Sequence, residues 1–164
     1  MRLDAANFVY YHPKGAMYGW FSDKGLRFLE LPLPNQRKLP LLHSFVNDHR
    51  VWILHEALER YFAGIREDFE RVPLDFTGAT PFQEKVWRAA RNVSWGTVST
   101  YGALAKMLEK PNAARAVGNA LGANPLPILV PCHRFLRTDG QLGGFSSGLE
   151  WKKELLRVEG ISVH

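Results

Sequence analysis

The chain has 164 residues, of which 46% are hydrophobic, and this composition excludes an intrinsically disordered chain and predicts one domain or two small ones. No apolar run approaches the roughly 20 residues of a membrane span, the first ten residues lack the apolar core of a signal peptide, and the single cysteine excludes an internal disulfide. The net charge of +5 lies entirely in residues 81–164, and such a basic half is typical of proteins that meet an anionic partner, although many basic surfaces bind nothing.

The first half of the chain has the pattern of short strands followed by a helix. The predicted strands are residues 7–12, 17–21 and 26–31, which are rich in aromatic or β-branched side chains and are separated by turns that contain glycine. Apolar residues then recur with helical spacing over residues 42–65. Residues 72–76 have the pattern of a further strand. The Thr77-Gly78-Ala79 stretch that follows predicts a domain boundary.

The second half of the chain is predicted to be mainly helical. Thr80 and Gln83 form the pattern of a capping box at the start of a helix, and Ser147 and Glu150 form another at the start of the final helix. Two short helices lie between them, at residues 100–108 and residues 113–122, with Asn112 as the predicted cap of the second. Two short helices joined by a tight turn indicate a helix-turn-helix.

These patterns together predict an α/β (α+β) fold in two parts. We expect a small α/β domain over residues 1–79 and a mainly helical, winged-helix-like domain over residues 80–164. The second domain holds the excess positive charge, with eleven Lys or Arg against six Asp or Glu. It is therefore the domain expected to meet an anion such as the phosphate backbone of a nucleic acid.

The predicted helix 113–122 has two different sides. Val117, Ala120 and Leu121 share one side and can pack inward. The opposite side consists of Arg115, Gly118, Asn119 and Gly122. Because a glycine inside a helix costs roughly 1 kcal/mol relative to alanine, two glycines on one face indicate a close approach. The approaching surface is either DNA or another helix of the same protein.

Cys132, the only cysteine, ends an apolar, proline-rich segment over residues 125–131 that we expect to be extended and buried. A lone cysteine is more often a core residue than a nucleophile. Here, however, His133 and Arg134 follow it, and such cationic groups are expected to lower the thiol pKa. Adjacent side chains of an extended segment point to opposite faces, so a water is the predicted relay between Cys132 and His133. Glu159 is the candidate that orients His133.

Several short motifs occur in a fixed order between residues 100 and 160. They are Thr100-Tyr101-Gly102-Ala103-Leu104-Ala105, Arg115-Ala116-Val117-Gly118-Asn119-Ala120, Asn124-Pro125, Pro131-Cys132-His133-Arg134, Gly143-Gly144-Phe145-Ser146 and Glu159-Gly160. In order and spacing this set resembles the O6-alkylguanine-DNA alkyltransferases, also called methylated-DNA–protein-cysteine methyltransferases. The first domain resembles the variable α/β domain of such proteins only in kind.

The resemblance implies a reaction. Cys132 would irreversibly accept an alkyl group from O6-alkylguanine, and O4-alkylthymine is a further candidate substrate. His133 would take the thiol proton through water, and Glu159 would orient His133. Asn124 would stabilise the turn that bears Cys132. Tyr101 would assist flipping of the nucleotide and donate a hydrogen bond to the base.

The resemblance also implies a partner, double-stranded DNA. Arg115 would enter the base stack where the flipped nucleotide has left. The other residues expected to contact DNA are Tyr101, Gly118, Asn119, Lys110 and Thr138, and the base pocket is expected to include Phe135 and Ser146. No cofactor is implied, and we predict no metal because the cysteines of the zinc site of some relatives are absent. We expect a monomer that can cluster on DNA and has no membrane partner, located in the cytoplasm at the nucleoid, or in the nucleus if the source is a eukaryote.

Three other functions remain open on the sequence. A lesion-binding protein would recognise alkylated DNA without modifying Cys132. A Cys-His-Glu hydrolase needs direct contact between nucleophile and base, which the adjacent placement of Cys132 and His133 disfavours. A helix-turn-helix transcription factor would leave the Pro131-Cys132-His133-Arg134 motif unexplained.

Overall fold

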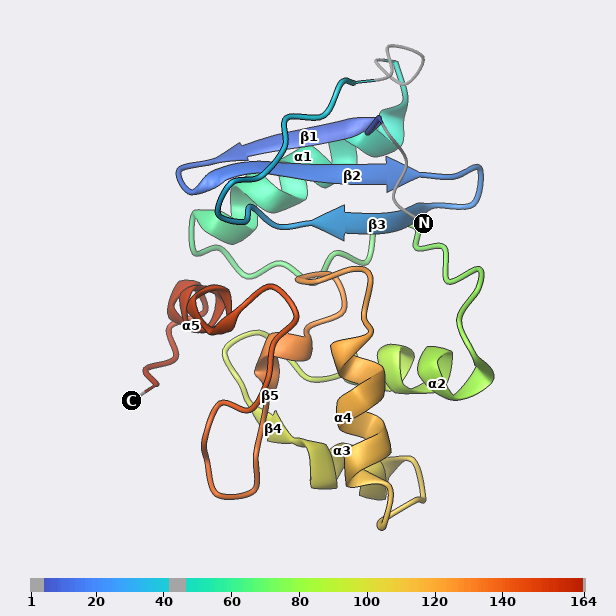
Figure 1. Ribbon diagram of the computed structural model, residues 1–164, viewed down its shortest axis with the longest axis vertical. Coiled ribbons are helices and arrows are strands. Elements are labelled where there is room, and N and C mark those ends of the chain that lie inside the picture. The colour runs from blue at the N-terminus through green and yellow to red at the C-terminus, as the bar shows by residue number, and fades with distance from the viewer. Residues whose placement is uncertain (1–4, 42–46, 164) are drawn as a thin grey trace. The chain divides into compact units, whose positions relative to one another are not determined.

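The computed structural model describes residues 5–41 and 47–163 (Figure 1). The chain divides into two compact units, Met1–Thr77 and Gly78–His164. The described elements combine helices with small sheets, which confirms the predicted α+β class. No helix in the described part of the chain has both the length and the apolar character needed to cross a lipid bilayer.

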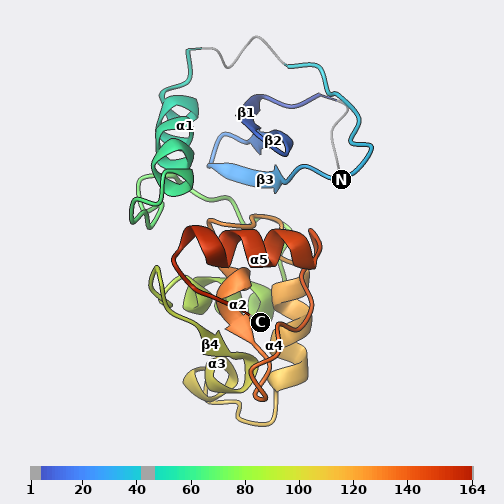
Figure 2. The ribbon, with the colours of Figure 1, turned by 90° about the vertical axis from the view of Figure 1, so that its left-hand side faces the viewer.

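The first unit is an antiparallel sheet with a helix on one face. Its strands are β1 (Phe8–His12), β2 (Gly15–Phe21) and β3 (Leu26–Glu30), in the order β1-β2-β3. The helix α1 (His49–Phe62) lies against β1 (Figure 2). There the ring of Phe62 stacks on Tyr10, with centroids 5.9 Å apart. The three strands predicted from the sequence are confirmed.

The helix α1 begins later than its apolar pattern predicts. Asp48 caps it, because the side chain of Asp48 accepts a hydrogen bond of 2.9 Å from the amide of Arg50. Residues 42–46, the start of the predicted range, lie outside the described residues. A capping aspartate therefore sets the observed N-terminus.

The strand predicted over residues 72–76 is wrong. Within this range, only Leu74 pairs with a strand, through a single parallel bridge to Leu26. Pro73 has no amide hydrogen to extend the ladder. Asp75 then turns the chain, because its carboxylate accepts a hydrogen bond of 2.9 Å from the amide of Thr77.

The second unit is mainly helical, as predicted. Its elements are α2 (Pro81–Ala90), β4 (Ser99–Thr100), α3 (Tyr101–Met107), α4 (Ala114–Gly122), the 3₁₀ helix η2 (Cys132–Arg134), β5 (Phe135–Leu136) and α5 (Leu149–Val158). The helices α2, α3 and α4 pack on one another, and η2 lies against α5 (Figure 1). The strands β4 and β5 form a parallel pair. The winged-helix detail stays a prediction.

The sequence predicts the N-terminal caps of three helices in this unit, and one of the three predictions is confirmed. Thr80 and Gln83 form the predicted capping box of α2, with hydrogen bonds of 3.0 and 3.1 Å. For α4 the predicted cap is wrong, because Ala113 occupies the cap position. For α5 the predicted box is also wrong, because the chain enters the helix at Gly148 with a φ of 96°, a conformation that favours glycine.

The segment over residues 125–131 is buried as predicted, but it is not extended. The amide of Val130 donates a hydrogen bond of 2.9 Å to the carbonyl of Leu126, and Ile128 has a φ of 76°. Asn124 fixes this turn from both ends. Its Oδ1 accepts from the amide of Leu126 at 2.9 Å, and its Nδ2 donates to the carbonyl of Val130 at 3.0 Å.

Candidate active site

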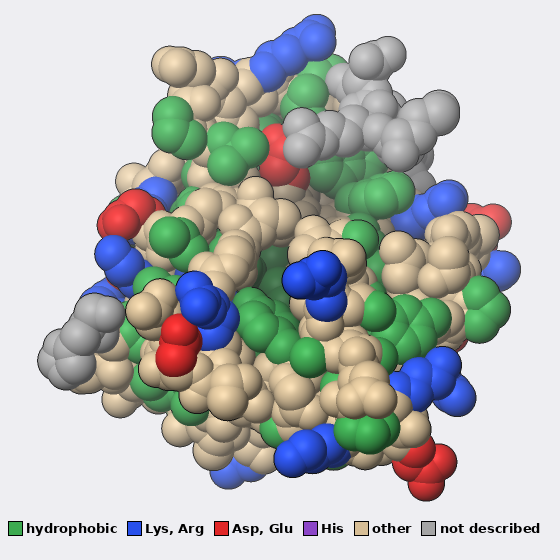
Figure 3. Space-filling model, turned by 60° about the horizontal axis from the view of Figure 1, so that its bottom comes forward, with side chains coloured by type: hydrophobic (Ala, Val, Ile, Leu, Met, Phe, Trp, Pro, Cys, Tyr) green, Lys and Arg blue, Asp and Glu red, His purple; other side chains and the backbone are tan. Residues whose placement is uncertain are grey.

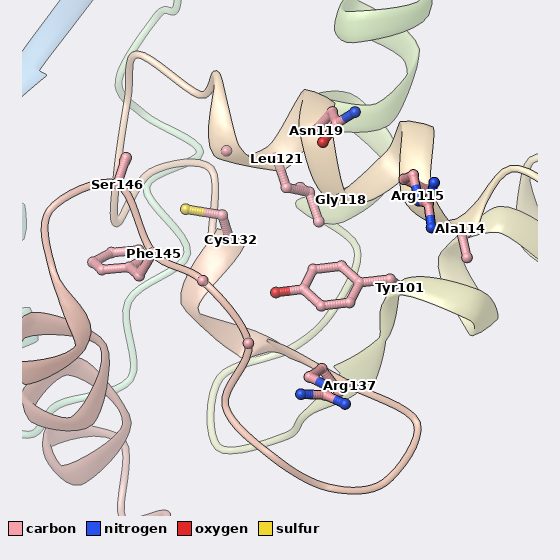
Figure 4. A pocket seen from close by; sticks show the side chains of 13 residues that line it. Tyr101, Ala114, Arg115, Gly118, Asn119, Leu121, Cys132, Arg137, Phe145 and Ser146 are labelled. Carbon is pink, nitrogen blue, oxygen red and sulfur yellow. The ribbon is translucent and has the colours of Figure 1, made fainter.

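A cavity of about 560 Å³ opens on the second unit (Figure 4). Its walls come from α3, α4, η2 and the loop that precedes α5, and its lining includes Tyr101, Arg115, Gly118, Cys132, Arg137 and Ser146. Figure 3 views the molecule from the end that carries α3 and α4, where Lys and Arg side chains surround a hollow with hydrophobic walls. A concave, largely apolar site with a few polar groups is typical of a ligand pocket.

Cys132 is 6% exposed, and its sulfur projects into this cavity (Figure 4). Burial raises the pKa of the Cys132 thiol, whereas a hydrogen bond of 3.2 Å from Nδ2 of Asn124 and the positive charge of Lys152 act to lower it. The sequence predicts that His133 and Arg134 lower the pKa of the Cys132 thiol. This prediction is wrong, because burial raises that pKa. Both side chains bind the carboxylate of Glu159. The resting thiol keeps its proton and needs a base to become a nucleophile.

His133 is fully buried and is the base nearest in sequence to Cys132. Its Nε2 lies 2.7 Å from Oε1 of Glu159. Burial lowers the pKa of His133, and the carboxylate of Glu159 opposes this effect. Burial also acts to raise the pKa of Glu159, but hydrogen bonds from His133 and Arg134 outweigh it and lower that pKa to about 2. The pair is therefore a neutral imidazole oriented by an ionised carboxylate.

Lys152 is a buried cation that the sequence analysis missed. Its side chain is fully buried on α5, and its Nζ donates hydrogen bonds to the carbonyls of Phe135, at 2.7 Å, and Gly144, at 3.3 Å. It also donates to the carbonyl of Leu142. Burial lowers the pKa of Lys152 to about 8, and the negative charge of a Cys132 thiolate would act to raise it. Lys152 thus ties β5 to the cavity loop and places a positive charge near the sulfur.

A sequence signal for Lys152 exists. It shares one helical stripe with Leu155, Leu156 and Glu159, at the spacing i, i+3, i+4 and i+7. Both leucines are buried, so a lysine on this stripe is directed inward. Arg137 was also missed as a cavity residue, and it carries an ion pair of 3.0 Å with Asp139.

Tyr101 is the first residue of α3, and its ring crosses the cavity (Figure 4). Gly143 leaves room for this ring. A Cβ at Gly143 would lie only 2.7 Å from the hydroxyl oxygen of Tyr101, whereas a Cβ at Gly118 would make an ordinary van der Waals contact with Cδ1 of Tyr101 at 3.8 Å. Burial raises the pKa of Tyr101, and the negative charge of a Cys132 thiolate would raise it further, so the phenol stays protonated.

The two sides of α4 are oriented as the sequence predicts. Val117, Ala120 and Leu121 are buried. On the other side Arg115, Asn119 and Gly122 are exposed, and Gly118 is half-buried. The alternative in which this side packs against another helix is therefore wrong for its exposed residues. The small outer face of α4 is accessible to a ligand beside the cavity.

The remaining predicted residues lie at different depths. Ser146 lines the cavity, whereas Phe135 is fully buried and does not line it. Lys110 and Thr138 are exposed outside the cavity, and Nζ of Lys110 lies 5.3 Å from the centre of the Phe82 ring. Among the described residues, no group of three or more His, Cys, Asp or Glu side chains is placed to hold a metal ion.

A family model and the sequences of known proteins point to the same family for this chain. Residues 81–161 match the family model described as the DNA-binding domain of 6-O-methylguanine DNA methyltransferase. Over 155 residues, 93% of the chain, the sequence is 37% identical to the methylated-DNA–protein-cysteine methyltransferase of Methanosarcina acetivorans, of which it covers 96%. The chain belongs to the methylated-DNA–protein-cysteine methyltransferase family. The resemblance inferred from the motifs is confirmed.

Other members of this family match different lengths of the chain. The methylated-DNA–protein-cysteine methyltransferase of Haemophilus influenzae is 50% identical over 105 residues, which are 64% of this chain and 58% of that relative. The chain thus spans less than two thirds of that relative's length. The crystal structure of Mycobacterium tuberculosis OGT in complex with DNA is 32% identical, covers 93% of this chain and 92% of its own, and has a TM-score of 0.77.

Proposed function

We propose that the protein repairs alkylated DNA by transferring an alkyl group from O6 of a guanine to the sulfur of Cys132, once per molecule. The observation that carries this proposal is the projection of a buried thiol into the cavity, next in the chain to a histidine that is paired with Glu159. Membership of the family supports the proposal, as does the M. tuberculosis relative in complex with DNA.

The first chemical step is activation of the thiol. Glu159 holds the proton of His133 on Nε2, which places the lone pair of the imidazole on Nδ1. His133 takes the proton of Cys132 through an intervening water. The thiolate then attacks the alkyl carbon, so that an S–C bond forms and the C–O bond to guanine breaks. The thioether product has no good leaving group, and each molecule therefore reacts once.

The second requirement is a good leaving group. Guanine departs with the electron pair of the broken C–O bond and gains a proton or a strong hydrogen bond. Tyr101 supplies the donor, because its hydroxyl stays protonated in the cavity. Asn124 supports the thiolate through its hydrogen bond to the sulfur. Ser146 lies on the wall that would face the base.

The third requirement is access to an atom inside the double helix. The damaged nucleotide leaves the base stack, at a cost of a few kcal/mol. Arg115, exposed beside the cavity on α4, fills the space that it leaves. The small face formed by Gly118, Asn119 and Gly122 suits the minor groove, where close approach is needed and little sequence is read. Double-stranded DNA is thus the proposed partner, bound by one copy of the protein per lesion.

Outside the cavity, further contacts go to the DNA backbone. Lys110 and Thr138 are exposed and are proposed to contact phosphates. Phosphate contacts give affinity without sequence preference, which suits a protein that must find lesions in any sequence. Binding is therefore expected to weaken as salt concentration rises.

Replacement of Cys132 tests the proposal. We expect Cys132→Ser and Cys132→Ala to bind a duplex with O6-methylguanine as tightly as the parent while leaving the lesion in place. Binding is measured by gel shift, and the lesion is quantified after digestion of the DNA. A duplex with unmodified guanine is the control. Repair by either variant at the parent's rate would exclude Cys132 as the acceptor, and a parent that binds without repair would identify a lesion-binding protein instead.

A further inference from the structure

Arg134 is a buried charge that the proposed mechanism does not yet use. Its guanidinium forms a bidentate ion pair with the carboxylate of Glu159, with Nε 2.9 Å from Oε2 and Nη2 2.8 Å from Oε1. Its Nη1 also donates a hydrogen bond of 2.6 Å to the carbonyl of Val93. Arg134 is 5% exposed, so these contacts are shielded from water.

The carboxylate of Glu159 is shared between two cationic or potentially cationic groups. Its Oε1 lies 2.7 Å from Nε2 of His133 and 2.8 Å from Nη2 of Arg134. Without the guanidinium, an isolated buried carboxylate beside His133 would strongly favour a protonated imidazole. With Arg134 in place, the carboxylate and the guanidinium cancel, and the burial of His133 decides its protonation.

We propose that Arg134 is a positioning residue that keeps His133 neutral and oriented, so that His133 can accept the proton of Cys132. This inference rests on the proposed function of His133 as the base. The charged groups that act on His133 are Lys152 of α5, Glu159 at the C-terminal cap of α5, and the next residue in the chain, Arg134. Burial and the charges of Arg134 and Lys152 lower the pKa of His133, and Glu159 raises it.

Two variants separate the charge of Arg134 from its hydrogen bonds. Arg134→Gln keeps a hydrogen-bond donor near Glu159 but removes the charge. Arg134→Lys keeps the charge but loses the bidentate contact with the carboxylate of Glu159. Arg157→Met is the matched control, because Arg157 also pairs with a glutamate, Glu154, but its side chain is exposed.

The readout is the titration of the His133 ring by NMR in the unreacted protein, with circular dichroism to check folding. We expect the pKa of His133 to rise by about one unit or more in Arg134→Gln, and to stay close to the parent value in Arg134→Lys and Arg157→Met. The acid limb of the pH profile of single-turnover transfer is expected to move upward by the same amount in Arg134→Gln.

An unchanged or lower His133 pKa in folded Arg134→Gln would overturn the proposal. If that variant does not fold, Arg134→Lys decides, because a rise of a full unit despite the retained charge would also overturn it. The ring titration needs no alkylated DNA. A parent protein that fails to transfer an alkyl group would therefore contradict the proposed function and leave the result on Arg134 standing.

Discussion

The Nδ2 of Asn124 lies 3.2 Å from the sulfur of Cys132, although the two residues are eight positions apart in the chain. The same amide group donates to the carbonyl of Val130, and its oxygen accepts from the amide of Leu126. One side chain therefore shapes the turn before Cys132 and donates a hydrogen bond to the nucleophile.

Asn124→Ala is expected to slow transfer and to destabilise the fold. The thiol pKa, already raised by burial, rises further because the hydrogen bond that lowers it is lost. The buried groups left without a partner cost about 1–3 kcal/mol. The thiol pKa is followed by the ultraviolet absorbance of the thiolate, and stability by urea unfolding. A thiol that titrates as in the parent would show that the contact does not act on Cys132.

Lys152→Met is expected to raise the pKa of Cys132, because the charge of Lys152 acts to lower it. Lys153→Met is the control, since Lys153 is the next residue on α5 and its side chain is half exposed in an ion pair with Glu150. Thiolate absorbance is measured against pH in both variants. The same shift in both would rule out a specific role for Lys152.

The lowered pKa of Lys152 predicts that the free energy of unfolding depends on pH. This pKa is about 8 in the folded protein, below the usual value of 10.5 for a lysine. Between these values the unfolded chain binds more protons, so the contribution of Lys152 to the free energy of unfolding increases as the pH rises through this window. The parent is expected to gain stability relative to Lys152→Met from pH 8 to 10.5 in urea titrations. A flat or falling difference would contradict this assignment.

Gly143→Ala is expected to slow transfer more than Gly140→Ala. Both glycines have a positive φ, 69° and 81°, so both substitutions strain the backbone. Only at Gly143 would the new Cβ meet a neighbour within 4 Å, the hydroxyl of Tyr101 at 2.7 Å. Single-turnover rates and unfolding curves separate the two effects. Equal transfer rates in the two variants would contradict the proposal that Gly143 makes room for Tyr101.

Arg115→Ala is expected to impair repair of duplex DNA more than reaction with free O6-benzylguanine. Arg115 is exposed beside the cavity on α4, where it can fill a gap in the base stack but need not contact a free base. Second-order rate constants for both substrates give the comparison. Losses of equal size would contradict the stacking role.

Local patterns in the sequence predicted those features that depend on neighbouring residues. The capping box of Thr80 and Gln83 and the buried side of α4 follow from spacing alone, and the structure confirms both. The boundaries of α1 and the cap of α5 were less accurate. Gly148 at the start of α5 has a backbone conformation that no side-chain pattern reveals.

Some features that depend on distant partners could not be predicted from local patterns. The sequence indicated Glu159 as the residue that orients His133, and the structure places Nε2 of His133 2.7 Å from Oε1 of Glu159. It did not predict that Arg134, expected to lower the thiol pKa, binds the same carboxylate. Likewise, the turn over residues 125–131 depends on the side chain of Asn124, and its proline-rich composition alone indicates an extended segment. Long-range hydrogen bonds thus decided the electrostatics of the site.

Cys132 is the proposed acceptor of the alkyl group. The most direct measurement is the intact mass of the protein after incubation with a duplex that contains O6-methylguanine, followed by peptide mapping. We expect the gain of one methyl group per molecule, located on Cys132, with loss of the lesion from the DNA. An unchanged mass with a reduced thiol and an intact lesion, or a methyl group on another residue, would contradict the account.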